Sequence, residues 1–173
     1  MPKINKFYKM PHKRRLEGKT NYKKRLGLVR GGKTRVVIRK SLDNISVQFV
    51  DYKKDGDVIK ASAASVTLEK LGWKAARGNI PAAYLTGLLA GLRAKKAGVK
   101  EAILDLGLQR NTKGSRLYAA LKGVLDAGVS VPHDAGILPD EKRISGQHIA
   151  AYVSSLKDLP KQFAEVKAAI MKM

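Results

Sequence analysis

The sequence contains no cysteine, which excludes a disulfide-stabilised scaffold and any zinc site built on cysteine ligands. Long apolar runs are also missing, because no stretch approaches the roughly 18–20 apolar residues that a membrane-spanning helix needs. The basic N-terminal stretch lacks the apolar segment of a secretory signal peptide. These absences predict a cytoplasmic protein with no membrane partner.

Acidic residues are scarce: 14 Asp and Glu stand against 35 Lys and Arg, giving a net charge of +21. Such an excess repels itself unless a polyanion neutralises it. The excess is concentrated in residues 1–40, which hold 15 Lys and Arg and a single acid, Glu17. Hydrophobic residues nevertheless make up 44% of the 173 residues, enough for one folded domain. The composition therefore predicts a basic arm attached to a more ordinary globular body.

Apolar patterning predicts an α/β fold with a mixed sheet. Strand patterns over residues 34–41, 44–52 and 57–65 are separated by turn residues, which is typical of a three-strand antiparallel meander. A helix over 81–96, a strand over 101–107 and a helix over 115–127 follow, with 129–131 as a candidate last strand. Helices over 146–156 and 160–171 complete the order as a C-terminal appendage.

Four local features refine the helical part of this prediction. Asn79 and Pro81 favour a helix start, and Ser115 is expected to cap the next helix. Gly87 and Gly91 lie four residues apart and predict a close approach of the first helix to the sheet. Trp73 is interpreted as a core or edge anchor rather than as a base-stacking residue.

Three regions are expected: a basic RNA-binding arm over 1–33, a globular α/β domain over 34–132 and a helical appendage over 133–173. Pro2 and Pro11 predict an extended start of the arm, with one or two helical turns between Arg14 and Leu28. The arm contains too few apolar residues to order itself in isolation.

Residues 27–34, GLVRGGKT, fit the phosphate-binding loop pattern G-x-x-x-x-G-K-[ST]. A working loop of this kind follows a buried strand and opens a helix. Here residues 21–25 are polar and basic, and the residues after Thr34 are strand-like. We interpret the match as a coincidence, with the glycines forming a turn between arm and sheet.

Hydrolytic and metal-dependent functions find little support in the sequence. The order of elements resembles that of ribonuclease-H-like enzymes, which need clustered carboxylates to hold paired metals. The first strand has no acid, and the candidate acids are interpreted as turn, strand-end or helix-end residues: Asp43, Asp51, Asp105 and Asp126. The three histidines are too scattered to suggest a metal site: His12, His133 and His148. We therefore predict no catalytic residue, no metal and no cofactor.

The arm is the strongest functional signal. Its Lys and Arg residues recur every few positions and are interleaved with Phe7, Tyr8 and Tyr22. Cations neutralise phosphates, and rings or guanidinium planes stack on unpaired bases, so nucleic acid is the favoured ligand. A solvated tail or a membrane-binding segment is the alternative, and the lack of an amphipathic apolar face weakens the latter. Composition does not separate RNA from DNA, so a DNA-compacting or RNA-processing protein stays open, with an NTPase third.

Several long segments resemble the archaeal form of one ribosomal protein family, the eighteenth of the large subunit. They are KRRLEGKTNYKKRLGLV, TRVVIRKSLDNISVQFV, GNIPAAYLTGLLAGLRAKKAGVKEAILDLGL and GSRLYAALKGVLDAGVSVPH. The resemblance runs from about Lys13 to Pro132 and continues into the appendage. It implies a structural, non-enzymatic protein of the large ribosomal subunit that binds 5S rRNA and helps attach it to the large-subunit rRNA in the central protuberance.

The resemblance also implies partners and contact residues. The partners are 5S rRNA, large-subunit rRNA and neighbouring large-subunit proteins, including another 5S-binding protein; those of the appendage stay undetermined. The rRNA contacts implied by the matching arm segment are Lys13, Arg14, Arg15, Lys19, Thr20, Tyr22 and Arg25. The continuing run of basic residues adds Lys23, Arg30, Lys33, Arg35, Arg39 and Lys40.

Overall fold

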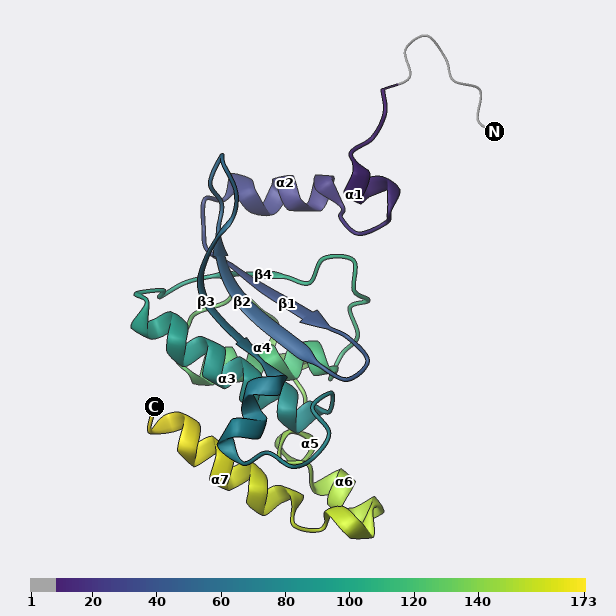
Figure 1. The fold of residues 1–173 in the computed structure, drawn as a ribbon, viewed down its shortest axis with the longest axis vertical. Coiled ribbons are helices and arrows are strands. Elements are labelled where there is room, and N and C mark those ends of the chain that lie inside the picture. Colours follow the sequence, from purple (N-terminus) through teal and green to yellow (C-terminus); the bar gives the residue numbers. More distant parts are fainter. Residues whose placement is uncertain (1–8) are drawn as a thin grey trace, which may run out of the picture.

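The computed structural model of the chain describes residues 9–173 (Figure 1). Phe7 and Tyr8, predicted stacking residues of the arm, lie outside the described residues. The helices are α1 Lys13–Leu16, α2 Tyr22–Arg30, α3 Ile80–Lys96, α4 Arg116–Asp126, α5 Glu141–Ile144, α6 Gln147–Tyr152 and α7 Leu159–Met171. The strands are β1 Arg35–Lys40, β2 Ile45–Asp51, β3 Val58–Ala64 and β4 Ile103–Asp105.

The strands form one sheet in the order β3-β2-β1-β4. β1 pairs antiparallel with β2, β2 pairs antiparallel with β3, and β4 runs parallel to β1. The predicted α/β class with a mixed sheet is thus confirmed. The candidate strand at 129–131 is wrong, since this segment makes only an isolated bridge between Glu101 and Ser130. Val129 and Val131 are buried, so their hydrophobicity reflects core packing rather than strand pairing.

The alternation of residues along the strands gives the sheet two different faces. Val36, Ile38, Val47 and Phe49 are completely buried and belong to the core shared with α3 and α4. In Figure 1, α3 and α4 lie below the sheet, whereas α1 and α2 lie above it. The other face of the sheet is therefore free of α3 and α4 and lies toward the arm; we call it the open face.

The glycines of α3 face α4, and the prediction that they lie against the sheet is wrong. A Cβ atom at Gly87 would lie 2.0 Å from the carbonyl oxygen of Ala120, and one at Gly91 would lie 2.6 Å from the Cβ of Ala127. On the opposite helix, a Cβ at Gly123 would lie 2.2 Å from the carbonyl oxygen of Tyr84. Because glycine has no side chain, the two helix backbones can approach this closely.

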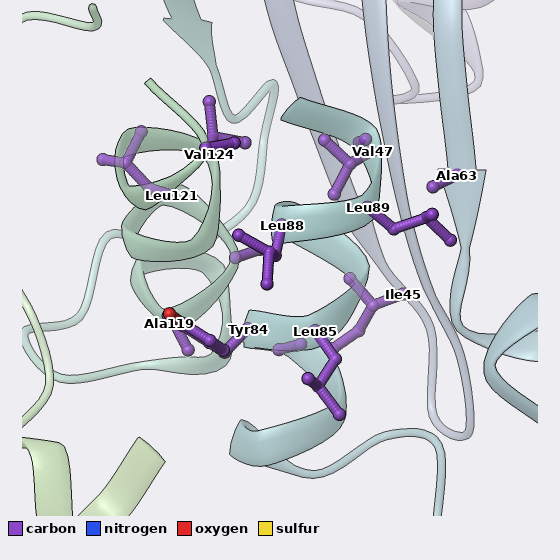
Figure 2. Close-up of a cluster of buried hydrophobic side chains, with 14 of the residues drawn as sticks. Ile45, Val47, Ala63, Tyr84, Leu85, Leu88, Leu89, Ala119, Leu121 and Val124 are labelled. Atoms are coloured by element: carbon purple, nitrogen blue, oxygen red, sulfur yellow. The ribbon is translucent and has the colours of Figure 1, made fainter. Parts of the chain in front are cut away.

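Leucines rather than glycines make the contact between α3 and the sheet. Figure 2 shows Leu85 and Leu89 beside the sheet residues Ile45 and Ala63. Leu88 lies between α3 and α4 in the same view. All three leucines are at most 2% exposed, so α3 is the central element of the core.

The predicted start of α3 is confirmed. The Asn79 side chain accepts a hydrogen bond from the Ala82 amide at 2.8 Å, and Pro81 lies in the first turn. Ser115 does occupy the N-cap position of α4, but its side chain makes no capping hydrogen bond. Its hydroxyl is instead buried without a hydrogen-bond partner among the described residues. Trp73 is 2% exposed, which confirms it as a core anchor.

The C-terminal helices pack on the same core. One side of α7 is buried, and its core residues are Leu159, Phe163, Val166 and Ile170. Tyr84 of α3 connects three helices: its hydroxyl donates to Asp126 of α4 at 2.8 Å, and its ring centroid lies 5.6 Å from that of Phe163 in α7. Burial, together with the hydrogen bond to Asp126, raises the pKa of Tyr84 above its ordinary value.

We expect Tyr84→Phe to lower the free energy of unfolding by about 1 kcal/mol at pH 8, because the hydrogen bond to Asp126 is lost. In the unchanged protein, the unfolded state ionises Tyr84 near pH 10, whereas the folded state keeps it protonated. The protonated Tyr84 hydroxyl therefore contributes its full stabilisation to the folded state below pH 10, and this contribution is lost as the pH rises further. The difference between the two proteins should thus shrink by about 1 kcal/mol between pH 8 and pH 11. Urea unfolding at both pH values measures it, and a difference independent of pH would contradict the assignment.

Candidate nucleic-acid interface

The arm is helical over more of its length than the sequence predicted. In place of one or two turns, it forms the four-residue α1 and the nine-residue α2. Asn21 explains the start of α2, since its side chain accepts a hydrogen bond from the Lys24 amide at 3.1 Å. The rings of His12 and Tyr22 lie 5.0 Å apart and connect the two helices. Neither helix has a buried residue, so the charged side chains of the arm face outward.

An alternating chain of guanidinium and carboxylate groups connects the arm to the sheet. Arg25 of α2 contacts Asp57 at 2.9 Å, and Asp57 contacts Arg35 of β1 at 2.7 Å. Arg35 also contacts Asp105 of β4 at 3.2 Å, and Asp105 contacts Arg39 at 3.0 Å. We call these five residues the ion-pair chain. It holds α2 against the end of the sheet by charge-assisted hydrogen bonds.

Arg35 occupies a different place from the other predicted contact residues. Its side chain is only 4% exposed, and its terminal nitrogens contact Asp57 and Asp105. The continuing run of basic residues suggested a surface position, but the two carboxylates draw this guanidinium into the protein. Arg35 therefore supports the arm and does not present its charge to solvent.

The other predicted contact residues remain at the surface. Those classed as exposed are Lys13, Arg14, Arg15, Lys19, Lys23, Arg30 and Lys33. Those that are partly exposed are Thr20, Tyr22, Arg25, Arg39 and Lys40. Lys19 pairs with Glu17 at 2.9 Å and Lys33 with Glu101 at 3.0 Å. Such exposed pairs contribute at most about 1 kcal/mol, so a phosphate can replace the carboxylate at little cost.

A hollow of about 770 Å³ lies between the arm and the open face of the sheet. The arm contributes Arg14, Lys19, Lys24 and Arg25 to its lining, and the open face contributes Arg39 and Gln48. The structure thus brings some of the predicted arm residues together with sheet residues over one concave surface. The hollow combines cations, amides and apolar side chains with two carboxylates that are already paired with arginines, Asp57 and Asp105, and this mixture suits a nucleotide better than a simple anion.

A third side of the hollow was missed by the sequence prediction: the loop after β4. Gln109 and Asn111 line the hollow there, and Arg110 and Lys113 are exposed beside them. The Gln109 amide donates to the Lys40 carbonyl at 2.9 Å, which fixes the loop against the end of β1. The sequence feature that could have indicated this loop is the segment LQRNTKG, which carries two cations and two side-chain amides between an apolar strand and a helix.

Three of the four acids considered for metal-dependent chemistry have structural partners, and the fourth, Asp43, is exposed in the turn between β1 and β2. Asp105 belongs to the ion-pair chain, and Asp126 contacts Tyr84 and Lys122. Burial raises the pKa of Asp51, but hydrogen bonds from Lys60 and Thr34 and the positive charge of Lys60 lower it more, so this carboxyl lies below its ordinary pKa. Within residues 9–173, no group of three or more His, Cys, Asp or Glu side chains is placed to hold a metal ion.

The segment GLVRGGKT has the reverse of the context that a phosphate-binding loop needs. Its first four residues belong to the end of α2, and β1 begins one residue after Thr34. Gly32 adopts a φ of +60°, a left-handed conformation that suits glycine, and forms the turn between helix and strand. The interpretation of the glycines as a turn between arm and sheet is confirmed for Gly31 and Gly32 and is wrong for Gly27, which lies within α2. In the same described part of the chain, no helix is long and apolar enough to cross a membrane.

Comparison with known proteins gives one consistent result. The family described as "Ribosomal large subunit proteins 60S L5, and 50S L18" matches residues 6–102 and 93–134. A large ribosomal subunit protein uL18 from Korarchaeum cryptofilum (strain OPF8) is 56% identical over 161 residues, covering 91% of this chain and 83% of that protein. Its counterpart from Methanococcus maripaludis is 51% identical over 155 residues, covering 90% of this chain and 80% of that protein.

Proposed function

The chain belongs to the family of large-subunit ribosomal proteins that includes 60S L5 and 50S L18, and from this premise we propose that it binds 5S rRNA. As a member of this family it is a structural ribosomal protein and not an enzyme. In the proposed role it helps attach 5S rRNA to the large-subunit rRNA in the central protuberance. Its further partners would be neighbouring large-subunit proteins, including another 5S-binding protein, in the cytoplasm.

The observation that supports this proposal best is the exposed cationic arm held over the hollow by the ion-pair chain. The RNA contacts that we propose are Lys13, Arg14, Arg15, Lys19, Thr20, Tyr22, Lys23, Arg25, Arg30, Lys33, Arg39 and Lys40. Ten of these twelve side chains are cations, which is enough for RNA binding dominated by phosphate neutralisation. Arg35 is proposed as a positioning residue, because its charge is already satisfied by two carboxylates.

We propose a division of labour among the three regions defined above. Residues 1–33 would make most of the RNA contacts, and residues 34–132 would form the scaffold that positions them and would add Arg39 and Lys40. Residues 133–173 would present a surface to neighbouring ribosomal components. The packing of α7 on the central core supports a rigid position for this last region relative to the sheet.

Competition binding at near-physiological salt tests the proposal. 5S rRNA, an unrelated structured RNA and duplex DNA are offered as competitors against labelled 5S rRNA. We expect 5S rRNA to compete at least about tenfold better than the other two. Phosphate contacts alone do not discriminate among nucleic acids, so this preference would come from recognition of the folded shape or the unpaired bases of 5S rRNA. Equal competition by all three would favour a DNA-compacting protein, and ATP turnover that is lost in Lys33→Ala would favour a hydrolase.

A further inference from the structure

We propose that the hollow between the arm and the open face admits an unpaired segment of ribosomal RNA, and that Gln48 recognises the edge of a base there. This inference rests on the proposed function and names the part of the RNA that enters the site. It adds a residue that recognises a base to the arm and sheet surface, whose other proposed contacts are mainly to phosphates.

Gln48 lies at the centre of the open face. It belongs to β2, an interior strand, and is opposite Val37 of β1 and Ser62 of β3 in the sheet register. Its side chain is partly exposed, and no described residue forms a hydrogen bond with its amide. A side-chain amide offers a donor and an acceptor together, which is the combination that pairs with the edge of a base.

The floor around Gln48 suits the face of a base. Val37 of β1 lies opposite the glutamine and Val50 lies two residues further along β2, and Ile59 extends the apolar surface into β3. An aliphatic floor accepts the face of a planar ring, while the amide meets its polar edge. Arg39, 40% exposed at the margin of this floor, is placed to contact the attached ribose or phosphate.

Cations surround the floor where the backbone of the RNA would run. Arg14, Lys19 and Lys24 line the hollow from the arm, and exposed Arg110 and Lys113 lie on the loop after β4. Phosphates can thus be held at the margins while one base points inward. Cationic margins on two sides also disfavour a basic ribosomal protein as the occupant, because like charges would repel.

The size of the hollow favours an unpaired segment over a duplex. At about 770 Å³, it lies within the roughly 300–1,000 Å³ of sites that hold one small organic molecule. Bases inside an A-form helix are hidden in a deep, narrow major groove, whereas bases of loops and bulges can be turned outward. A base inserted on the floor must therefore come from a loop, a bulge or an end.

Two matched substitutions test this inference with 5S rRNA as the probe. Gln48→Met keeps the length of the side chain and removes its amide, and Gln147→Met makes the same change on the exposed start of α6. We expect Gln48→Met to weaken 5S binding about tenfold, as one lost base contact would. We also expect at least one unpaired base to lose its protection from dimethyl sulfate, while the salt dependence stays the same. Gln147→Met should bind within about twofold of the unchanged protein.

The two proposals fail in different ways. If the unchanged protein prefers 5S rRNA but Gln48→Met keeps full affinity and every base protection, the inference about Gln48 is wrong and the proposed function stands. If the unchanged protein shows no preference for 5S rRNA, both are wrong. Thermal unfolding of each variant separates a lost RNA contact from a folding defect. Gln48→Glu serves as a second substitution at this position, because it retains the hydrogen-bond acceptor of the side chain.

Discussion

Deletion of residues 1–30 is expected to weaken 5S rRNA binding by at least about a hundredfold, because it removes most of the proposed phosphate contacts. The body should stay folded, since none of the described residues of this segment is buried. Asp57 loses Arg25 in the deletion but keeps Arg35, so no buried carboxylate is left without a partner. Filter binding measures the affinity, and circular dichroism with thermal unfolding measures the fold.

A charge-matched pair of variants separates the position of the charge from its amount. The arm variant replaces four exposed cations by glutamine: Lys13, Arg14, Lys19 and Lys23. The control variant replaces four exposed cations of the C-terminal region: Lys142, Arg143, Lys157 and Lys172. Each set contains three lysines and one arginine, so the net charge falls equally. If both variants lost the same amount of 5S rRNA affinity, binding would depend only on the net charge of the protein, and the position of the cations in the arm would have no special role.

Gly87→Ala is expected to lower the free energy of unfolding by at least about 2 kcal/mol. The new Cβ would lie 2.0 Å from the carbonyl oxygen of Ala120 and 2.9 Å from its Cα, and these backbone atoms cannot turn away as a side chain would. Helices α3 and α4 must separate, and overpacking of this kind costs typically 1–3 kcal/mol or more. The better helix propensity of alanine recovers up to about 1 kcal/mol. Denaturant unfolding measures the net change.

Gly27→Ala is the control for this prediction. Gly27 is an exposed residue of α2, and a Cβ there would have no atom within 4 Å. The same chemical change should therefore leave the midpoint of unfolding unchanged or raise it slightly through helix propensity. Equal unfolding energies for the two variants would show that α3 and α4 do not need glycine at their crossing.

The sequence predicted those features that depend on local patterns. Alternating residues in β2 placed Ile45, Val47 and Phe49 on one face, and Asn79 with Pro81 indicated the start of α3. The partner of each buried face was not predictable in this way, because periodicity reports which side is buried and not what covers it. Gly87 was therefore assigned to the sheet, although it faces α4.

The site was predictable where it depends on charge along the chain. The basic residues of the arm were found because they follow one another in sequence. The burial of Arg35 was not, because its partners Asp57 and Asp105 lie 22 and 70 residues away. The loop with Gln109 and Asn111 was missed for the same reason: only the fold brings it beside the arm. The family itself was predicted from long matching segments, and the comparisons confirm it.

The salt dependence of 5S rRNA binding, compared between the full chain and the chain lacking residues 1–30, tests most directly whether the arm holds the RNA phosphates. With ten proposed cationic contacts, the log–log slope of affinity against salt concentration should be about −7 to −9 for the full chain. Of these ten contacts, Lys33, Arg39 and Lys40 remain in the truncated chain and would give a slope of about −2 to −3, which Arg110 and Lys113 at the margin of the hollow would steepen to at most about −5. Equal slopes would show that the cations of the arm do not contact the RNA.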